Sequence, residues 1–177
     1  MLFRSWHYKK FKTGLCAEHN FSPLAQSVFK DKVAYTLPEV ARVLASDDQT
    51  VKFQMRLSDG SLVETVLIPF SGKYSLCVSS QVGCAMACTF CFTGLQGYKR
   101  HLRTSEIIGQ YMTARQWLED NRGTLNPISN IVFMGQGEPL HNFDNVKKAC
   151  DIFLDQRGLS LAQNKITVST SGYLPGL

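Results

Sequence analysis

The sequence lacks an apolar run long enough to span a membrane, and residues 1–10 lack the apolar stretch of a secretory signal. It also lacks internal repeats and low-complexity segments. Its six cysteines are poorly placed for a disulfide framework, because four of them fall between Cys77 and Cys91. These absences argue against a membrane-spanning or disulfide-stabilised secreted protein. Crowded thiols without an export signal instead predict a cytoplasmic protein that binds a metal and has no membrane partner.

The composition predicts a folded chain of modest size. With 177 residues, 44% of them apolar, the chain is long enough for one packed domain with at most a small appendage. Nineteen basic residues against fourteen acidic ones give a net charge of +5. This charge is compatible with a polyanionic partner but does not demonstrate one.

The pattern of residues changes near positions 50 and 74. Residues 1–50 predict an incomplete accessory segment of short helices, and Ser22-Pro23 is typical of a helix start. Residues 51–73 predict a β-hairpin followed by a linker over 69–73. The hairpin is indicated by apolar residues that alternate with polar ones from Val51 to Leu57, with a turn-forming Ser-Asp-Gly directly afterwards.

Residues 74–177 predict an α/β fold, because strands and helices alternate along this segment. The predicted strands are 75–78, 130–134 and 165–170, and the predicted helices begin at Thr104 and Asn142. Strands separated by helices pair in parallel with right-handed crossovers, and ligands bind at the carboxyl ends of such strands. The sequence therefore predicts that the cysteine-rich loop, the 135–139 loop and residues 169–172 meet on one rim.

Three cysteines in one short stretch are the most informative motif. Cys84, Cys88 and Cys91 are separated by three residues and then by two. A closed zinc site or an ordinary iron–sulfur cluster takes four protein ligands, whereas three cysteines leave one iron of a four-iron cluster open for chemistry. The alternative is a zinc site of these three cysteines and His101, although zinc-ligand cysteines more often come in pairs.

Several motifs together resemble one family, the radical S-adenosylmethionine (SAM) RNA methyltransferases of the RlmN type. The motifs are the cysteine triplet, Cys77-Val-Ser-Ser-Gln-Val-Gly-Cys84, Gln96-Gly-Tyr98, Met134-Gly-Gln-Gly-Glu-Pro-Leu140 and Val168-Ser-Thr-Ser-Gly172. This resemblance implies the first part of a radical-SAM partial (β/α) barrel, preceded by a small helical segment and a β-hairpin. It also implies methylation of carbon-2 of an adenine in 23S rRNA and in tRNA, and thus a role in rRNA and tRNA processing.

The resemblance implies two cofactors, a [4Fe-4S] cluster and SAM. Cys84, Cys88 and Cys91 would hold the cluster, and SAM would bind its open iron. Gly137, Glu138 and Ser169 match family positions that contact SAM; from the sequence pattern alone, Ser169 is an ordinary polar residue at a strand end. An external electron donor is also implied.

Glu64 and Cys77 match the family's catalytic residues. By resemblance, Glu64 accepts a proton and Cys77 helps to resolve a covalent protein–RNA intermediate. By pattern alone, Glu64 is a polar residue on a hairpin strand and Cys77 is a small buried strand residue. Gln136 stands where the family resemblance would lead us to expect methionine.

The resemblance further implies that family members continue for about as many residues again. The remaining barrel strands and the cysteine that carries the methyl group would then come from a continuation or a separate chain, and these 177 residues alone would form no methyladenine. Two alternatives stay open: a carbon-8 adenine methyltransferase of the same family, and a zinc-binding RNA module without catalysis. Tyr98–Arg103 interleaves aromatic and basic residues, which favours an RNA-facing segment or else a solvated loop.

Overall fold

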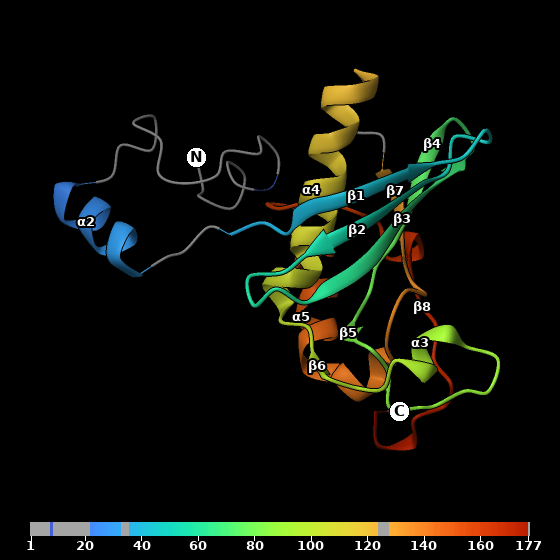
Figure 1. The fold of residues 1–177 in the computed structure, drawn as a ribbon. Coiled ribbons are helices and arrows are strands. Elements are labelled where there is room, and N and C mark those ends of the chain that lie inside the picture. The colour runs from blue at the N-terminus through green and yellow to red at the C-terminus, as the bar shows by residue number, and fades with distance from the viewer. Residues whose placement is uncertain (1–7, 9–21, 33–35, 124–127, 177) are drawn as a thin grey trace.

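The structure, a computed structural model, describes Tyr8 and residues 22–32, 36–123 and 128–176. A six-stranded sheet organises these residues, in the order β1-β2-β3-β4-β7-β8. Its strands are β1 (Glu39–Ala45), β2 (Val51–Arg56), β3 (Leu62–Phe70), β4 (Lys73–Cys77), β7 (Ile128–Phe133) and β8 (Ile166–Val168). The strands from β1 to β4 pair antiparallel, whereas β4, β7 and β8 pair in parallel. The sheet thus joins a meander to the predicted parallel unit (Figure 1).

Two long helices cover one face of the sheet. They are α4 (Thr104–Arg122), which lies behind the strands in Figure 1, and α5 (Phe143–Leu154). Alternate residues of β2 point into the core between the sheet and α4, where Val51, Phe53 and Met55 are fully buried. Tyr111 of α4 packs edge-on against Phe153 of α5, with ring centroids 5.8 Å apart. The opposite face of the sheet carries the half-buried residues of the same strands.

Shorter elements lie beyond the carboxyl ends of the parallel strands. They are β5 (Gln81–Val82), α3 (Phe92–Leu95) and β6 (Arg100–His101), with 3₁₀ turns η2 (Pro139–Asn142) and η4 (Leu174–Gly176). The 3₁₀ turn η3 (Gln163–Lys165) instead leads into the amino end of β8. The helix α2 (Pro23–Lys32) lies to one side of the sheet in Figure 1. None of the helices among the described residues has the length and apolar character required to cross a bilayer.

The predicted strands and helices of residues 74–177 are confirmed, with boundaries shifted by two residues at most in the strands. Two helix starts differ in detail. Arg103 rather than Thr104 is the N-cap of α4, and the carboxylate of Glu106 accepts the Arg103 N–H at 2.8 Å. Asn142 precedes α5 but makes no side-chain cap hydrogen bond. Its amide instead donates to the buried backbone carbonyls of Ser80 and Leu102, both at 2.8 Å.

Two predictions before residue 74 are wrong in part. Residues 39–45 were predicted as helical, but they form β1, which pairs with β2. Most of β1 is exposed, so it lacks the alternation of apolar and polar residues by which a half-buried strand is recognised. Residues 69–73 are the end of β3, a two-residue turn and the start of β4, rather than a linker. Helix α2 agrees with the predicted start at Ser22-Pro23; the remainder of residues 1–35 lies largely outside the described residues.

Candidate functional site

Three loops that follow the parallel strands border one hollow of about 280 Å³. They come after β4, β7 and β8, which is the convergence on one rim that the sequence predicted. We call residues 84–93 the cysteine loop and residues 134–138 the glutamate loop. The hollow is lined by Cys84, Met86, Cys88, Phe90, Cys91, Thr93, Phe133, Met134, Gly135, Gly137, Glu138, Ser169, Thr170 and Ser171.

The three thiols of the cysteine loop are free and partly exposed. Burial raises the pKa of Cys84, against a hydrogen bond from the backbone N–H of Met86 that lowers it. The backbone N–H groups of Gly94 and Thr93 lower the pKa of Cys91, since they stabilise its thiolate. The loop therefore offers three soft sulfur ligands. Of Cys84 and Cys91, Cys91 ionises more readily.

The three thiols line one hollow without converging on a single point. Among the residues that the structure describes, no three His, Cys, Asp or Glu side chains converge closely enough to hold one metal ion. A four-iron cluster binds each cysteine at a different iron, so its thiols need to border one hollow without meeting at a point. His101 does not line this hollow, and its ring contacts Gln81 instead. The zinc site of three cysteines and His101 is therefore not assembled here.

Glu138 ties two of the rim loops together. The side chain is 3% exposed, and its Oε1 accepts the Leu140 N–H at 2.9 Å. Its Oε2 accepts both the N–H and the hydroxyl of Ser171, at 2.7 and 2.9 Å. Burial alone would raise the pKa of Glu138, but these hydrogen bonds outweigh burial and lower it. The carboxylate is thus ionised and largely occupied by the protein, which leaves little acceptor capacity for a ligand.

The backbone of Gly137 lies close to the side chain of Gln81. Its φ of 101° is a conformation that side chains disfavour, and a Cβ built there would lie 2.5 Å from the Cβ of Gln81. A glycine at this position therefore permits the close approach of the Gln81 side chain. Ser169 is exposed, follows β8 and lines the hollow.

Glu64 and Cys77 lie on the face of the sheet that the long helices leave uncovered. Cys77 pairs with Val66 of β3, two residues beyond Glu64, so the two side chains share this face on neighbouring strands. Oε1 of Glu64 lies 2.7 Å from the ammonium of Lys52. Cys77 is 9% exposed, and burial raises its pKa against a hydrogen bond from the Met134 N–H. Neither side chain lines the hollow of the cysteine loop.

A buried hydrogen-bond network that the sequence analysis missed holds the rim to α4. The side-chain Oε1 of Gln110 accepts a hydrogen bond from the Ser79 N–H at 2.8 Å, and its Nε2 donates to the Ser79 carbonyl at 2.9 Å. The Ser79 hydroxyl donates to the carbonyl of Glu64 at 2.6 Å and accepts the N–H of Gln136 at 2.9 Å. The signal in the sequence was the polar run 79–81 directly after a buried strand.

Arg100 is a structural residue rather than part of a free basic surface. Its guanidinium forms a bidentate pair with Glu106, at 2.8 and 2.9 Å, and its Nε lies 2.7 Å from Asp59. This contact holds the pKa of Asp59 well below its ordinary value. Leu102 in the same segment is fully buried. Within Tyr98–Arg103, Arg100 and Leu102 are therefore held by the fold, whereas Tyr98, Lys99 and Arg103 are exposed.

Comparison with known proteins agrees with these motifs. The model of the radical SAM superfamily matches residues 78–176. A probable dual-specificity RNA methyltransferase RlmN of Akkermansia muciniphila is 44% identical over 180 residues, which cover 97% of this chain and 48% of that protein. One of Aquifex aeolicus is 45% identical over 168 residues (94% and 46%), and the dual-specificity RNA methyltransferase RlmN of Nitratidesulfovibrio vulgaris is 42% identical over 177 residues (97% and 49%). The chain spans about half the length of these relatives.

A solved structure shares the fold as well. The crystal structure of a radical SAM methyltransferase from Sphaerobacter thermophilus matches 97% of this chain with a TM-score of 0.84 and 32% sequence identity, and the match covers half of that protein (50%). The mixed α/β sheet with its helices is consistent with the predicted partial barrel. A family model that covers more than half of the chain, together with this structural likeness, identifies the chain as a member of the radical SAM superfamily.

Proposed function

We propose that this chain forms the cofactor-binding part of an RNA methyltransferase that methylates carbon-2 of adenine in 23S rRNA and tRNA. The observation that carries the proposal is the meeting of the cysteine loop, the glutamate loop and residues 169–171 around one hollow. The names of the curated relatives support an RNA substrate. The motifs from Cys77 to Cys84 and from Met134 to Leu140 favour the carbon-2 type.

In this proposal the residues of the hollow divide between two cofactors. Cys84, Cys88 and Cys91 hold a [4Fe-4S] cluster, and the backbone around Gly137 and the side chain of Ser169 contact SAM. The bound cofactors, reduced by an external electron donor, supply the radical chemistry. Because Glu138 is already hydrogen-bonded to Leu140 and Ser171, its main contribution is to fix the loops that face SAM.

Glu64 and Cys77 act on the open face of the sheet. Burial favours the neutral thiol of Cys77, so any role that needs its thiolate first requires loss of the Sγ proton. The carboxylate of Glu64 is available on the same face to take up a proton, and Lys52 holds it there by an ion pair. These roles follow the family resemblance, and the shared face of the two residues supports them. The remaining barrel strands would be supplied by a continuation of the chain or by a partner.

Anaerobic reconstitution with iron and sulfide tests the cofactor assignment. Wild-type chain is expected to bind iron and acid-labile sulfide, and alanine at Cys84, Cys88 or Cys91 to abolish this binding, because each thiol holds its own iron. Cys77→Ala is the matched control and is expected to retain the cluster. Colourless protein that binds zinc, or an equal loss of iron in Cys77→Ala, would overturn the assignment.

Mass spectrometry of RNA from cells that lack the gene tests the reaction. Loss of 2-methyladenosine from 23S rRNA and tRNA is expected. Loss of 8-methyladenosine instead would overturn the carbon-2 assignment. Unchanged RNA would overturn the proposal that 23S rRNA and tRNA are the substrates.

A further inference from the structure

The buried residue Gln81 links the glutamate loop to two histidines. Gln81 belongs to the short strand β5 and is fully buried. Its Oε1 accepts the backbone N–H of Glu138 at 2.8 Å. Its Nε2 lies 3.0 Å from Nδ1 of His101 and 3.2 Å from Nδ1 of His141. A single amide therefore contacts three segments that are distant in the sequence.

These contacts determine which atoms carry protons. The N–H of Glu138 is only a donor, so the Gln81 atom that faces it is the oxygen, and the NH₂ group faces the two rings. Both amide hydrogens then find acceptors only if Nδ1 of His101 and Nδ1 of His141 are unprotonated. Each ring is consequently a neutral imidazole with its proton on Nε2. No other protonation state satisfies all three contacts.

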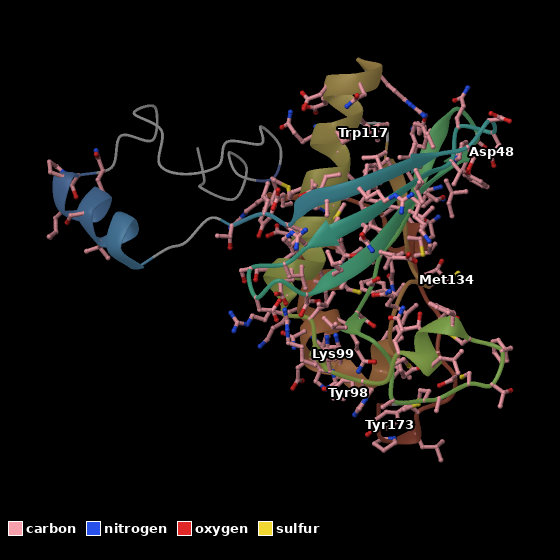
Figure 2. The ribbon with its side chains drawn as sticks, viewed as in Figure 1. Asp48, Tyr98, Lys99, Trp117, Met134 and Tyr173 are labelled. Carbon is pink, nitrogen blue, oxygen red and sulfur yellow. The ribbon has the colours of Figure 1, made fainter. Side chains whose placement is uncertain are left out.

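Aromatic side chains and a few charged groups surround the two rings. The centroids of the two imidazole rings lie 4.9 Å apart. The ring centroid of Tyr98 lies 5.4 Å from that of His101, and the ring centroid of Tyr173 lies 4.9 Å from that of His141. Figure 2 shows Tyr98, Lys99 and Tyr173 together at the end of the molecule beyond the sheet. The charged groups nearby are Lys99 and Arg100 beside His101, Glu138 at the far end of Gln81, and Asp144, which borders the same hollow as both histidines. Arg100 is neutralised by Asp59 and Glu106.

We propose that Gln81 is the positioning residue of the glutamate loop, and that His101 and His141 hold its amide in the required orientation. We call the contacts of Gln81 with Glu138, His101 and His141 the Gln81 clamp. The close packing of Gly137 on the Gln81 side chain adds a steric contact to it. Only the identity of the loop's ligand, SAM, rests on the proposed function. The clamp itself rests on the three hydrogen bonds.

A proton on either Nδ1 places two donors face to face and breaks the clamp. Burial, and then the neighbouring His141, lower the pKa of His101 below its ordinary value of 6.5. A histidine whose pKa is lowered by folding stabilises the fold fully above the unfolded pKa. This stabilisation is lost as the pH falls from about 6.5 through the lowered value. The glutamate loop is therefore expected to be tight at pH 8 and to loosen only at a pH below the ordinary histidine pKa of 6.5.

Nitrogen-15 NMR of the histidine side chains tests the proposal directly, without cluster or SAM. At pH 8 both rings are expected to show Nε2–H and unprotonated Nδ1. A proton on Nδ1 of either ring would overturn the proposal. This measurement uses the wild-type chain, so it does not depend on whether a variant folds.

Two variants of Gln81 separate positioning from simple packing. Gln81→Glu keeps the acceptor for Glu138 but presents an oxygen to the rings, so both are expected to acquire Nδ1–H and the pKa of His101 to rise by about one unit or more. Gln81→Met keeps the volume but loses all three contacts, and hydrogen exchange of the Glu138 amide is expected to accelerate about tenfold. Exchange at Glu138 is expected to stay close to wild type in Gln81→Glu. Equal exchange in both variants, with unchanged histidine tautomers, would show that Gln81 only fills space.

SAM binding to the reconstituted chain distinguishes this inference from the proposed function. Affinity is expected to fall about tenfold in Gln81→Met and to change less in Gln81→Glu. If the tautomers are as stated but the wild-type chain binds neither cluster nor SAM, the proposed function fails and the clamp stands. Equal affinities of the two variants for SAM would show that the Gln81 clamp does not position the glutamate loop.

Discussion

The cysteine loop and the glutamate loop border the same hollow but are held in opposite ways. Glu138 is buried and hydrogen-bonded to Leu140 and Ser171, whereas the cysteine loop exposes Phe90 at 92% and Phe92 at 74%. Among the described residues, the hydrogen bonds of the cysteine loop run mostly within its own backbone, such as Cys91 N–H to Cys88 at 3.0 Å. The glutamate loop is thus held by other parts of the fold, whereas the cysteine loop is held mainly by its own backbone. Figure 2 places Met134, at the start of the glutamate loop, between the sheet and the cysteine loop.

The largest expected difference is between a phenylalanine that precedes the glutamate loop and one within the cysteine loop. Phe133 leads into the glutamate loop and is 1% exposed, so Phe133→Ala is expected to cost about 3–5 kcal/mol of unfolding free energy. Phe90→Ala in the cysteine loop removes an exposed ring and is expected to change stability by less than about 0.5 kcal/mol. Urea unfolding of both variants measures the contrast. A comparable loss in Phe90→Ala would show that the cysteine loop is packed as firmly as its neighbour.

Two glycines with positive φ sharpen the same comparison. Gly137→Ala adds strain and a clash with Gln81, so we expect a loss of about 3 kcal/mol. Gly97, after the cysteine loop, has a φ of 70° and open space around its Cβ position, so Gly97→Ala carries only the backbone strain of about 1–2 kcal/mol. Denaturation midpoints compare them. Equal losses would mean that Gln81 yields easily, which would also weaken the proposed clamp.

The rate of thiol alkylation compares the cysteine loop with the buried end of β4. The cysteines of the cysteine loop are partly exposed, whereas Cys77 is buried and its pKa is raised by burial. We therefore expect Cys77 to react roughly 100-fold more slowly at pH 8, because its reaction requires local opening as well as ionisation. Mass spectrometry of peptides after timed iodoacetamide treatment gives each rate. Cys77 reacting as fast as Cys91 would place the end of β4 in an open, mobile region.

The smallest expected difference is between two serines that line the hollow. Ser171→Ala removes one hydrogen bond to the buried Glu138 carboxylate and is expected to cost about 1–2 kcal/mol. Ser169→Ala alters an exposed residue, with an expected change within about 0.5 kcal/mol, while SAM affinity is expected to fall in the reconstituted chain. Unfolding curves and SAM titration are both required. A stable, SAM-competent Ser169→Ala protein would leave Ser169 the ordinary strand-end residue that its pattern alone suggests.

The sequence by itself determined the features that depend on local spacing. The alternation from Val51 to Leu57 predicted the hairpin because a pleated strand has a period of two. The order of strands and helices after residue 74 predicted the parallel unit, and with it the rim where three loops meet. The spacing of Cys84, Cys88 and Cys91 predicted the open cluster, which stays a prediction until iron binding is measured.

Only the tertiary structure decided which polar groups support that rim. Gln81 meets Glu138 from 57 positions away, and Arg100 meets Asp59 from 41, so no local pattern records either contact. The exposed strand β1 is of the same kind, since its partner β2 rather than its own periodicity makes it a strand. Spacing along the chain specifies which face of an element is buried. Hydrogen-bond partners are chosen only when those elements pack, because a buried polar group must be satisfied by whatever donor or acceptor the fold brings within reach.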